Sequence, residues 1–533
     1  MRFPFFRIVA HVLGIVGLAL LLPVTSSIWY AEDLRTVCAF AVPSFACLLL
    51  AGLCLMKRST DLVPIKPSLA FCIVGGVWIG VCFLGAIPLW TSGAFSGMTD
   101  AVFESISGFT TTGASVTPSV EALPRSINLW RCETHWLGGM GVIALAVALV
   151  PLLGVGGFRL IKAETSGPEK GRITPRIAST AKTLWIIYLA LTAAQALLLR
   201  FAGLGWFDSV CHAFSTLGTG GFSTRNASIG AFGNPAAEWI CVLFMLLASV
   251  NFALYYRLFT GKVGELFKDT ELRTFIGIVA LFVLAVTMAE KADDFGGFLP
   301  LLRHSAFQVA SIVSTTGFMT SDYANWRPAA QAFLFLLFFV GGCSGSTAGG
   351  IKVIRWAVLG KQLRNEMRRI THPREVTTIR INGYSGRDEI VPLVAAFVTL
   401  YALSVFATAI AGTFAGLGLL EAISCALSMV GNIGPAFGSF GPTANYSKIP
   451  DALKWGFSFA MIAGRLEIFT MLILIGRIIS LLASPSKILR RTKIRDLLIS
   501  LAKTFAAGIS WGGIPIELLF LCQIWQFCAV IAV

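Results

Sequence analysis

Long apolar runs dominate the pattern along the chain. A transmembrane helix needs about 20 mainly apolar residues to cross the hydrocarbon core. Ten stretches approach or exceed this length, at 8–30, 37–56, 68–90, 129–154, 180–202, 236–258, 274–290, 329–358, 391–412 and 453–482. The sequence therefore predicts an all-α polytopic membrane protein. Because further spans follow the first one and no small-residue cleavage site separates them, we expect the first span to be retained rather than removed as a signal peptide.

Four shorter, semi-polar stretches lie between these spans. Each is too short to cross a bilayer, and each runs into a glycine-containing turn, near 100–110, 207–217, 303–314 and 419–430. Irregular backbone at membrane depth is tolerated only where protein or a water-filled cavity covers it. We therefore expect re-entrant segments, and from residue 68 onward four repeats of span, pore helix and span around a pseudo-fourfold pore.

The predicted organisation has six parts. They are two leading spans (1–67), repeat 1 (68–156), repeat 2 (180–260), repeat 3 with a broken second helix (274–360), repeat 4 (390–483), and an atypical tail (484–533) that is first basic and then apolar.

Composition supports the membrane assignment, and charge sets the orientation. Of 533 residues, 56% are hydrophobic and 13% are charged, whereas a soluble domain has about 25% charged residues. A soluble, disordered or nucleic-acid-binding protein is therefore excluded, despite a net charge of +15. Lys and Arg collect in the loops after spans 129–154, 236–258 and 329–358. The positive-inside rule then predicts that these loops and the N-terminus are cytoplasmic, and that the re-entrant segments open outward.

The four re-entrant segments end in related strings, which suggests one duplicated unit. The strings are Ser107–Ser115, Ser215–Ser223, Ser311–Met319 and Ser428–Ala436. Aligning one glycine in each (Gly113, Gly220, Gly317 and Gly434) gives intervals of 107, 97 and 117 residues. A dehydrated cation needs a ring of oxygen dipoles, and glycine permits the backbone angles that turn carbonyls toward an axis. We predict a cation filter made of Thr111, Thr112, Gly113, Gly218, Thr219, Gly220, Thr315, Thr316, Gly317, Asn432, Ile433 and Gly434.

Acidic residues precede three of the strings. Asp100, Asp208 and Glu421 lie 13, 12 and 13 residues before their glycines, and His304 stands at this offset in the third repeat. An acid suits the N-terminus of a helix, and the negative C-terminal end would then point at the filter.

Span 329–358 contains a run of small and polar residues. The run is Gly341, Gly342, Cys343, Ser344, Gly345, Ser346, Thr347, Ala348, Gly349 and Gly350, followed by Ile351 and Lys352. It is not a nucleotide P-loop, because the lysine is displaced and no Ser or Thr follows it. One interpretation is a packing surface between helices. The interpretation that we favour is an unwound gate below the filter, with Lys352 beside it.

Arg465 lies near the middle of span 453–482. A charge at this depth must face a cavity or a partner. We expect Arg465 to act as an electrostatic barrier under the filter and to hold the broken loop through carbonyl hydrogen bonds. The alternative is a structural pair with a carboxylate of a neighbouring helix.

Over residues 1–483 the chain resembles the Trk/Ktr/HKT superfamily of cation transporters, most of all its bacterial TrkH-type branch. The resemblance rests on the four filter strings and on three further motifs, Trp136–Gly141, Gly341–Lys352 and Gly464–Phe469. It implies potassium-selective uptake across the bacterial inner (cytoplasmic) membrane, with K⁺ as the transported ion. In this family the broken helix is the gate loop and the arginine maps onto Arg465. Sodium-favouring members often have serine at the first filter glycine, so four glycines favour potassium.

The resemblance also implies partners. It suggests a homodimer with one pore per protomer, surrounded by membrane lipid, and a cytosolic TrkA-like ring that binds NAD, ADP or ATP and opens the gate. The chain itself has no recognisable nucleotide site.

Two other functions were weighed. A membrane enzyme would need a reactive constellation of side chains, which we do not find, and the twelve cysteines and five histidines show no metal-ligand spacing. A secondary transporter usually has inverted repeats, whereas these four share one orientation; coupling to H⁺ or Na⁺ stays open. The tail beyond Ser484 departs from the family, and could be an interfacial helix, an extra span or the product of an altered reading frame.

Overall fold

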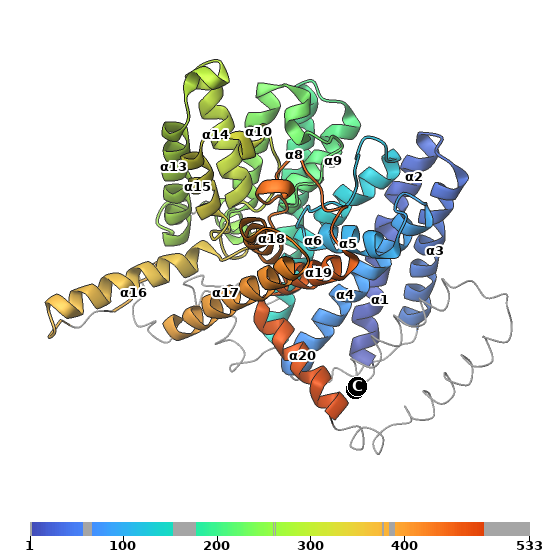
Figure 1. Ribbon diagram of the computed structural model, residues 1–533. Coiled ribbons are helices and arrows are strands. Elements are labelled where there is room, and N and C mark those ends of the chain that lie inside the picture. Colours follow the sequence, from blue (N-terminus) through green and yellow to red (C-terminus); the bar gives the residue numbers. More distant parts are fainter. Residues whose placement is uncertain are drawn as a thin grey trace.

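A computed structural model describes residues 3–56, 67–152, 177–259, 261, 263–375, 378–382 and 390–483. Within these ranges the regular elements are helices, so the all-α prediction is confirmed (Figure 1). The predicted tail, 484–533, and most of the basic loop after the first repeat lie outside the described residues.

Two leading helical segments pack side by side at one edge of the molecule. α1 (Phe3–Ala19) continues into α2 (Leu21–Trp29), and α3 (Leu34–Met56) returns alongside them. The hydroxyl of Ser44 in α3 donates to the Gly17 carbonyl of α1 at 2.7 Å. The small residue at 17 lets the helices approach this closely, since a side chain there would meet Leu48.

Four helical units of one design follow. The first consists of α4 (Pro67–Thr91), α5 (Met98–Phe109) and α6 (Arg125–Leu152). The second has α8 (Ile177–Phe201), α9 (Trp206–Gly218), η1 (Ser228–Phe232), α10 (Pro235–Ala248), α11 (Phe252–Phe259) and the short α12 (Val263–Leu266). The third has α13 (Thr270–Ala289), η2 (Ala292–Phe295), α14 (Phe298–Val313), η3 (Tyr323–Asn325), α15 (Pro328–Leu337) and α16 (Val353–Thr371). The fourth has α17 (Ile390–Phe414), α18 (Leu419–Gly431), η4 (Gly438–Phe440), α19 (Asp451–Arg465) and α20 (Ile468–Ala483).

The short helices α5, α9, α14 and α18 coincide with the four predicted re-entrant segments to within a few residues. They lie inside the bundle, and their C-terminal halves are buried. Glycines let neighbouring helices reach those ends. Any side chain at Gly138 of α6 would strike the Phe109 carbonyl, and one at Gly464 of α19 would strike the Val430 carbonyl.

The second helix is interrupted in three units, whereas the sequence predicted a break only in the third. α10 and α11 meet at 95°, α19 and α20 meet at 114°, and α15 and α16 are separated by the glycine-rich loop. By length and composition, six described helices could each cross a membrane, or up to eight if each bent pair forms one span. The remaining predicted spans are α6, which carries polar residues, and the interrupted 329–358.

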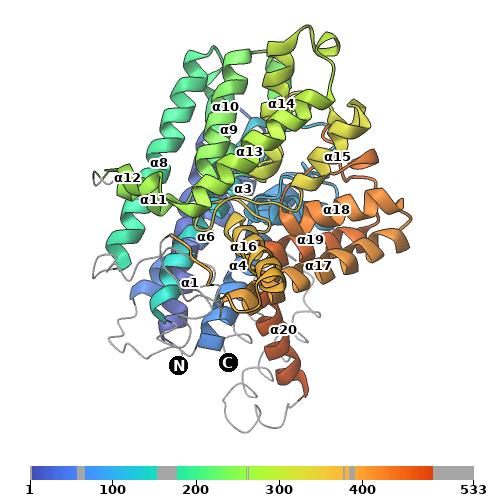
Figure 2. The same cartoon turned by 90° about the vertical axis from the view of Figure 1, so that its left-hand side faces the viewer.

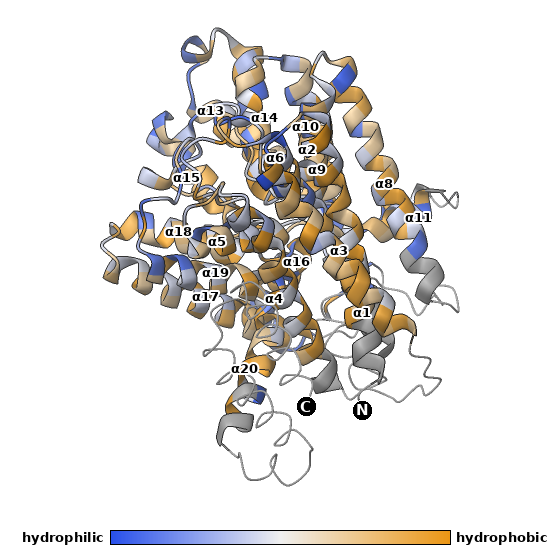
Figure 3. Ribbon diagram, turned by 90° about the vertical axis from the view of Figure 1, so that its right-hand side faces the viewer, coloured by the Kyte–Doolittle hydropathy of each residue, from blue (hydrophilic) through white to orange (hydrophobic). Residues whose placement is uncertain are grey.

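Apolar side chains cover the outer helices, as a lipid-facing surface requires. Leu281 of α13 and Phe406 and Ile410 of α17 are exposed, and the outer helices are coloured mainly as hydrophobic in Figure 3. The amphipathic helix α16 projects beyond the bundle, beside α17, and ends in the basic residues Arg368 and Arg369 (Figures 1 and 2).

Candidate functional site

The same backbone turn ends all four short helices. Thr111, Thr219, Thr315 and Asn432 have φ values of 54°, 56°, 55° and 55°, in the left-handed region. The next residue in each unit donates its amide to a serine carbonyl four residues before the turn, at 2.9 Å each time: Thr112 to Ser107, Gly220 to Ser215, Thr316 to Ser311, and Ile433 to Ser428. One local geometry is therefore used four times, although the side chains differ.

This geometry corrects the alignment of the second string by one residue. The glycine two positions after each turn residue has positive φ, and these glycines are Gly113, Gly221, Gly317 and Gly434. The predicted Gly220 instead occupies the place of Thr112, Thr316 and Ile433. Gly220 and Gly221 are adjacent in the sequence. Residue types alone therefore could not decide which of the two aligns with Gly113, Gly317 and Gly434. The triplet in this unit is Thr219–Gly221 rather than Gly218–Gly220.

The four extended segments after these turns meet in a closed ring. A Cβ atom built on each glycine would collide with a backbone carbonyl oxygen of another unit. Gly113 faces the Gly220 oxygen, Gly221 faces Thr316, Gly317 faces Ile433, and Gly434 faces Thr112. The order runs from the first unit to the fourth and returns to the first. These four glycines also have positive φ. A side chain at any of them would therefore strain the backbone and also collide with a carbonyl oxygen.

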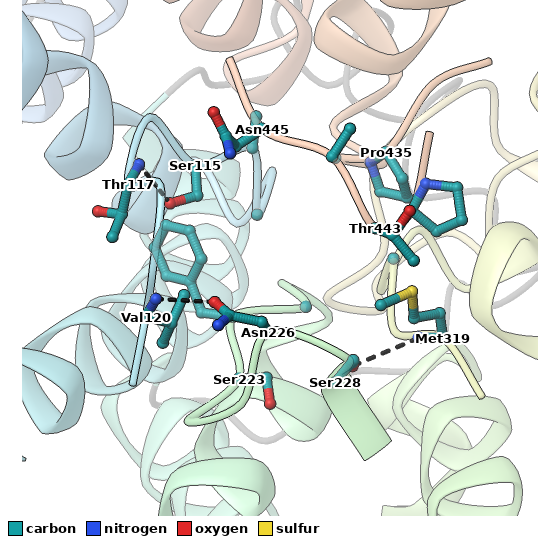
Figure 4. A pocket seen from close by; sticks show the side chains of 18 of the residues that line it. Ser115, Thr117, Val120, Ser223, Asn226, Ser228, Met319, Pro435, Thr443 and Asn445 are labelled. Atoms are coloured by element: carbon teal, nitrogen blue, oxygen red, sulfur yellow. Dashed lines mark hydrogen bonds between the residues drawn. The ribbon is translucent and has the colours of Figure 1, made fainter. Parts of the chain in front are cut away.

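All four ring glycines line one cavity whose wall has both polar and apolar side chains. Its wall includes Ser115, Ser223, Met319, Pro435 and Thr443. Figure 4 shows these five residues grouped around it, drawn from segments of all four units. The hydroxyl groups of Ser115, Ser223 and Thr443 give this cavity oxygen atoms of the kind that suit a hard cation.

The acids predicted to start the short helices bind neighbouring segments through their carboxylates. Asp208 accepts from the Thr224 hydroxyl at 2.5 Å and Glu421 accepts from the Ser439 amide at 2.8 Å. Asp100 forms an ion pair with Lys454 at 2.6 Å. Asp100, Asp208 and Glu421 are in the first turns of their helices. His304, which has the corresponding offset in the third unit, lies further along α14 because that helix begins at Phe298.

The glycine-rich loop is non-helical and buried directly against the turn of the third unit. The Gly349 amide donates to the Thr315 hydroxyl at 2.7 Å. The Cys343 amide donates to the Ser249 carbonyl at 2.8 Å, and the Lys352 ammonium group contacts the Ala348 carbonyl. Of the ten residues 341–350, only Gly345 is exposed. The loop is therefore non-helical, as the sequence predicts, and it connects the turn of the third unit at Thr315 to the break in the second unit at Ser249.

Arg465 reaches this loop from the last residue of α19. Its Nη1 donates to the Thr347 carbonyl at 2.7 Å, and its Nη2 donates to the Gly138 carbonyl of α6 at 3.1 Å. The side chain is only 5% exposed. The contact with Thr347 is of the kind expected from the sequence, a hydrogen bond to a carbonyl of the broken loop, whereas the contact with Gly138 of α6 was not predicted. The neighbouring acid Glu467 instead pairs with Arg355 of α16 at 2.8 Å.

Sequence reasoning missed Glu271, at the start of α13. One of its carboxylate oxygens accepts from the Ser344 amide at 2.6 Å and from the Ile354 amide at 3.3 Å, so it joins the loop to the first turn of α16. It is 5% exposed. The available signal was an acid directly before a predicted span, but its partners are far away in sequence.

Comparisons with known proteins identify the family. A family model described as a cation transport protein, TrkH, matches residues 38–481. The "Trk system potassium uptake protein TrkH" of Halomonas elongata is 37% identical over 88% of this chain and 98% of its own length. The protein of the same name from Escherichia coli K12 is 35% identical, with the same two shares.

A solved structure agrees with these matches. The crystal structure of the potassium transporter TrkH from Vibrio parahaemolyticus superposes with a TM-score of 0.80 at 35% identity, and covers 89% of this chain and 98% of that chain. The relatives are named for transport, which confirms the expectation of a transporter rather than an enzyme. The chain belongs to the TrkH family of cation transport proteins.

Proposed function

We propose that this protein takes up potassium ions across the bacterial cytoplasmic membrane through a four-segment selectivity filter. The observation that carries the proposal is the closed ring in which each positive-φ glycine faces a carbonyl of the next unit. The names of the relatives, which refer to potassium uptake, support the choice of ion. K⁺ is the substrate of this site, and it would exchange its water shell for the oxygens of the four segments.

In this proposal the filter residues are Thr111–Gly113, Thr219–Gly221, Thr315–Gly317 and Asn432–Gly434. The four short helices place their C-terminal ends below the ring, and the negative end of a helix dipole favours a cation. The four units thus surround one pore with pseudo-fourfold symmetry.

Residues 341–350 form the gate below the filter in the same proposal, and Arg465 restrains it. The direct hydrogen bond from Gly349 to Thr315 supports this assignment, because any movement of the loop would break or shift this bond to the filter turn. A guanidinium group in the path of a cation raises an electrostatic barrier. Lys352 lies beside the same loop.

Assembly follows the family. We propose a homodimer in the cytoplasmic membrane, with the N-terminus in the cytoplasm. The regulator would be a cytosolic TrkA-like ring that binds NAD, ADP or ATP, which agrees with relatives named as parts of a Trk system. The basic end of α16, with Arg368 and Arg369, lies outside the bundle where such a ring could reach it.

The test is a flux measurement. The purified full chain is reconstituted into liposomes, and K⁺ and Na⁺ fluxes are measured under imposed gradients, with and without a TrkA-like partner and nucleotide. Potassium-selective flux is expected. Equal sodium flux would contradict potassium selectivity, and flux that stays absent with the partner present would contradict the gated pore.

A further inference from the structure

Beyond the ring of glycines lies a second ring of contacts that joins the four segments. Two residues after each ring glycine, a backbone carbonyl accepts a hydrogen bond from another unit. The four acceptors are Ser115, Ser223, Met319 and Ala436, and we name these four contacts the staples. Figure 4 shows Ser115, Ser223 and Met319 around the rim of the cavity.

The staples follow one cyclic order, in which each unit holds the segment of the next. The fourth unit holds the first through the Tyr446 amide on Ser115 (2.8 Å), and the second holds the third through the Gly230 amide on Met319 (3.1 Å). The third holds the fourth through the Tyr323 hydroxyl on Ala436 (3.1 Å). The first holds the second through Arg131 Nη1 on Ser223, the longest of these contacts at 3.5 Å.

Arg131 makes the one charged staple of the four. Its Nε donates to Glu104 at 2.7 Å, and the two side chains are 1% and 0% exposed. Its guanidinium group also stacks on the ring of Phe222, 4.1 Å from the centroid, in the segment that it staples. Two contacts therefore hold Arg131 to the second segment. The stacking on Phe222 adds to the weak attraction of the long hydrogen bond to Ser223.

Glu104 holds the first segment from the opposite side. Its carboxylate accepts from the Ser115 hydroxyl and from the Val116 amide, each at 2.9 Å, and Arg131 Nη2 adds a bond to the Ser115 hydroxyl at 3.2 Å. The pair thus spans the junction between the first and second segments. The planar guanidinium fork directs Nε, Nη1 and Nη2 toward Glu104, Ser223 and Ser115, so these three bonds have a fixed arrangement relative to one another.

We propose that the Glu104–Arg131 pair is a positioning element that sets the spacing of the first two filter segments, and thereby the discrimination between K⁺ and Na⁺. A buried ion pair is a weak source of stability, because desolvation offsets much of its attraction. Its place at a segment junction points instead to a geometric role. The inference rests on the proposed function, since it assigns a determinant of selectivity to that filter.

The chain offers a matched control. Arg303 of α14 pairs with Glu238 of α10 through the same atoms at the same distance, Nε to a carboxylate oxygen at 2.7 Å, and Glu238 is likewise buried. This pair joins two helices of different units. Arg303 bonds to the side chains of Glu238 and His304, neither of which belongs to a filter segment. If a buried ion pair acted on permeation only by stabilising the fold, neutralising either pair should therefore change the K⁺/Na⁺ permeability ratio equally.

The experiment compares two neutralised pairs in full-length protein. The variants are Glu104→Gln/Arg131→Gln and Glu238→Gln/Arg303→Gln, and changing both partners avoids leaving a lone buried charge. The K⁺/Na⁺ permeability ratio is measured in liposomes, and folding is followed by the melting temperature. Arg131→Lys, which keeps the charge and loses the fork, replaces the first variant if that variant does not fold.

We expect the ratio to fall by about three- to tenfold in the Glu104/Arg131 variant, the factor that corresponds to one net hydrogen bond, and to stay at the wild-type value in the control. An unchanged ratio in both variants, or an equal fall in both, would overturn this inference alone. A wild-type chain without potassium selectivity would overturn the proposed function, and this inference with it.

Discussion

Single residues in the glycine ring have almost no freedom to change. Gly113 has φ of 79°, and any side chain there points at the Gly220 carbonyl. The left-handed region costs a non-glycine residue about 1–2 kcal/mol, and the displaced carbonyl would change the oxygen cage around the ion. If the ring is the proposed filter, a substitution at this position changes ion selectivity as well as stability.

We predict that Gly113→Ser lowers the K⁺/Na⁺ permeability ratio by about fivefold or more, the factor that 1 kcal/mol of strain at the filter corresponds to. Reconstituted flux with each ion measures it. Gly456→Ala is the control, because Gly456 lies in α19 with no atom within 4 Å of its Cβ position. Unchanged permeability ratios in Gly113→Ser would count against the filter assignment.

Arg465 carries the second residue-scale prediction. Its two carbonyl bonds hold the glycine-rich loop against α6, so Arg465→Ala should release the loop and remove the barrier. A hydrogen bond from a charged group contributes about 1.5–3 kcal/mol, so basal K⁺ flux without any partner should rise by about tenfold or more. Arg369→Ala, at an exposed site of α16, should leave basal flux unchanged. Unaltered or lower flux in Arg465→Ala would remove its barrier role.

The sequence could predict these residues only in part. The turns after α5, α14 and α18 each contain one usable glycine, so the alignment of those three strings needed no coordinates. In the second string the choice between Gly220 and Gly221 depends on φ and on hydrogen bonds to Ser215, which composition does not encode. The role of Arg131 could not be predicted for another reason. Its partner Glu104 belongs to a different helix, so their contact depends on how the two helices pack.

At the scale of elements, the breaks in the second helices concentrate contacts around one loop. The break after α10 supplies the Ser249 carbonyl, the break after α19 supplies Arg465, and the start of α13 supplies Glu271. Glycine content predicted the break in the third unit, since ten small residues make a poor helix. The breaks at Ser249–Asn251 and Leu466–Glu467 were not predicted, because those residues lie in apolar runs of ordinary helical composition.

We predict that Glu271→Ala raises basal flux, because one amide of the loop (Ser344) and one of α16 (Ile354) lose their buried acceptor, at a cost of about 1–3 kcal/mol for each unsatisfied group. Glu271→Gln, which keeps one carbonyl oxygen as an acceptor, should give a smaller rise. Flux in Glu271→Ala that is equal to the wild type would show that the loop is held without this side chain.

A double-mutant cycle with Arg465→Ala tests whether both residues act on one loop. Residues that hold the same element have non-additive effects. We therefore expect Glu271→Ala/Arg465→Ala to raise flux by less than the product of the two single increases. A simple product would mean that Glu271 and Arg465 act independently.

For the whole molecule, the repeat pattern was the most informative signal. Four short segments between spans predicted the all-α architecture and the location of the four short buried helices, because a membrane leaves few ways to satisfy backbone groups. The number of spans was less predictable. α6 contains Arg131, Glu133 and His135, all of which are buried inside the bundle. These polar residues lower the hydropathy of α6, so it is harder to recognise as a span from the sequence.

Orientation is the property of the whole molecule that the charge pattern predicts most directly. The loop after α16 carries Arg374, and the rim of the cavity is bordered by the loop that carries Glu121; both residues are exposed. The positive-inside rule places the first loop in the cytoplasm and the second outside. A filter for uptake must also open to the external medium. The proposed uptake function therefore requires the orientation that the charge pattern predicts.

We predict that Arg374→Cys and Glu121→Cys react with a membrane-impermeant thiol reagent from opposite sides. In right-side-out vesicles Glu121→Cys should be labelled and Arg374→Cys should be protected, and in inverted vesicles the pattern should be reversed. The parent chain is the control, because Cys38 is also exposed. Labelling of both variants from one side would contradict the predicted topology, since the filter and the α16 loop would then share a compartment. The reverse pattern would place the gate outside, and uptake through the proposed path would require another arrangement of gate and filter.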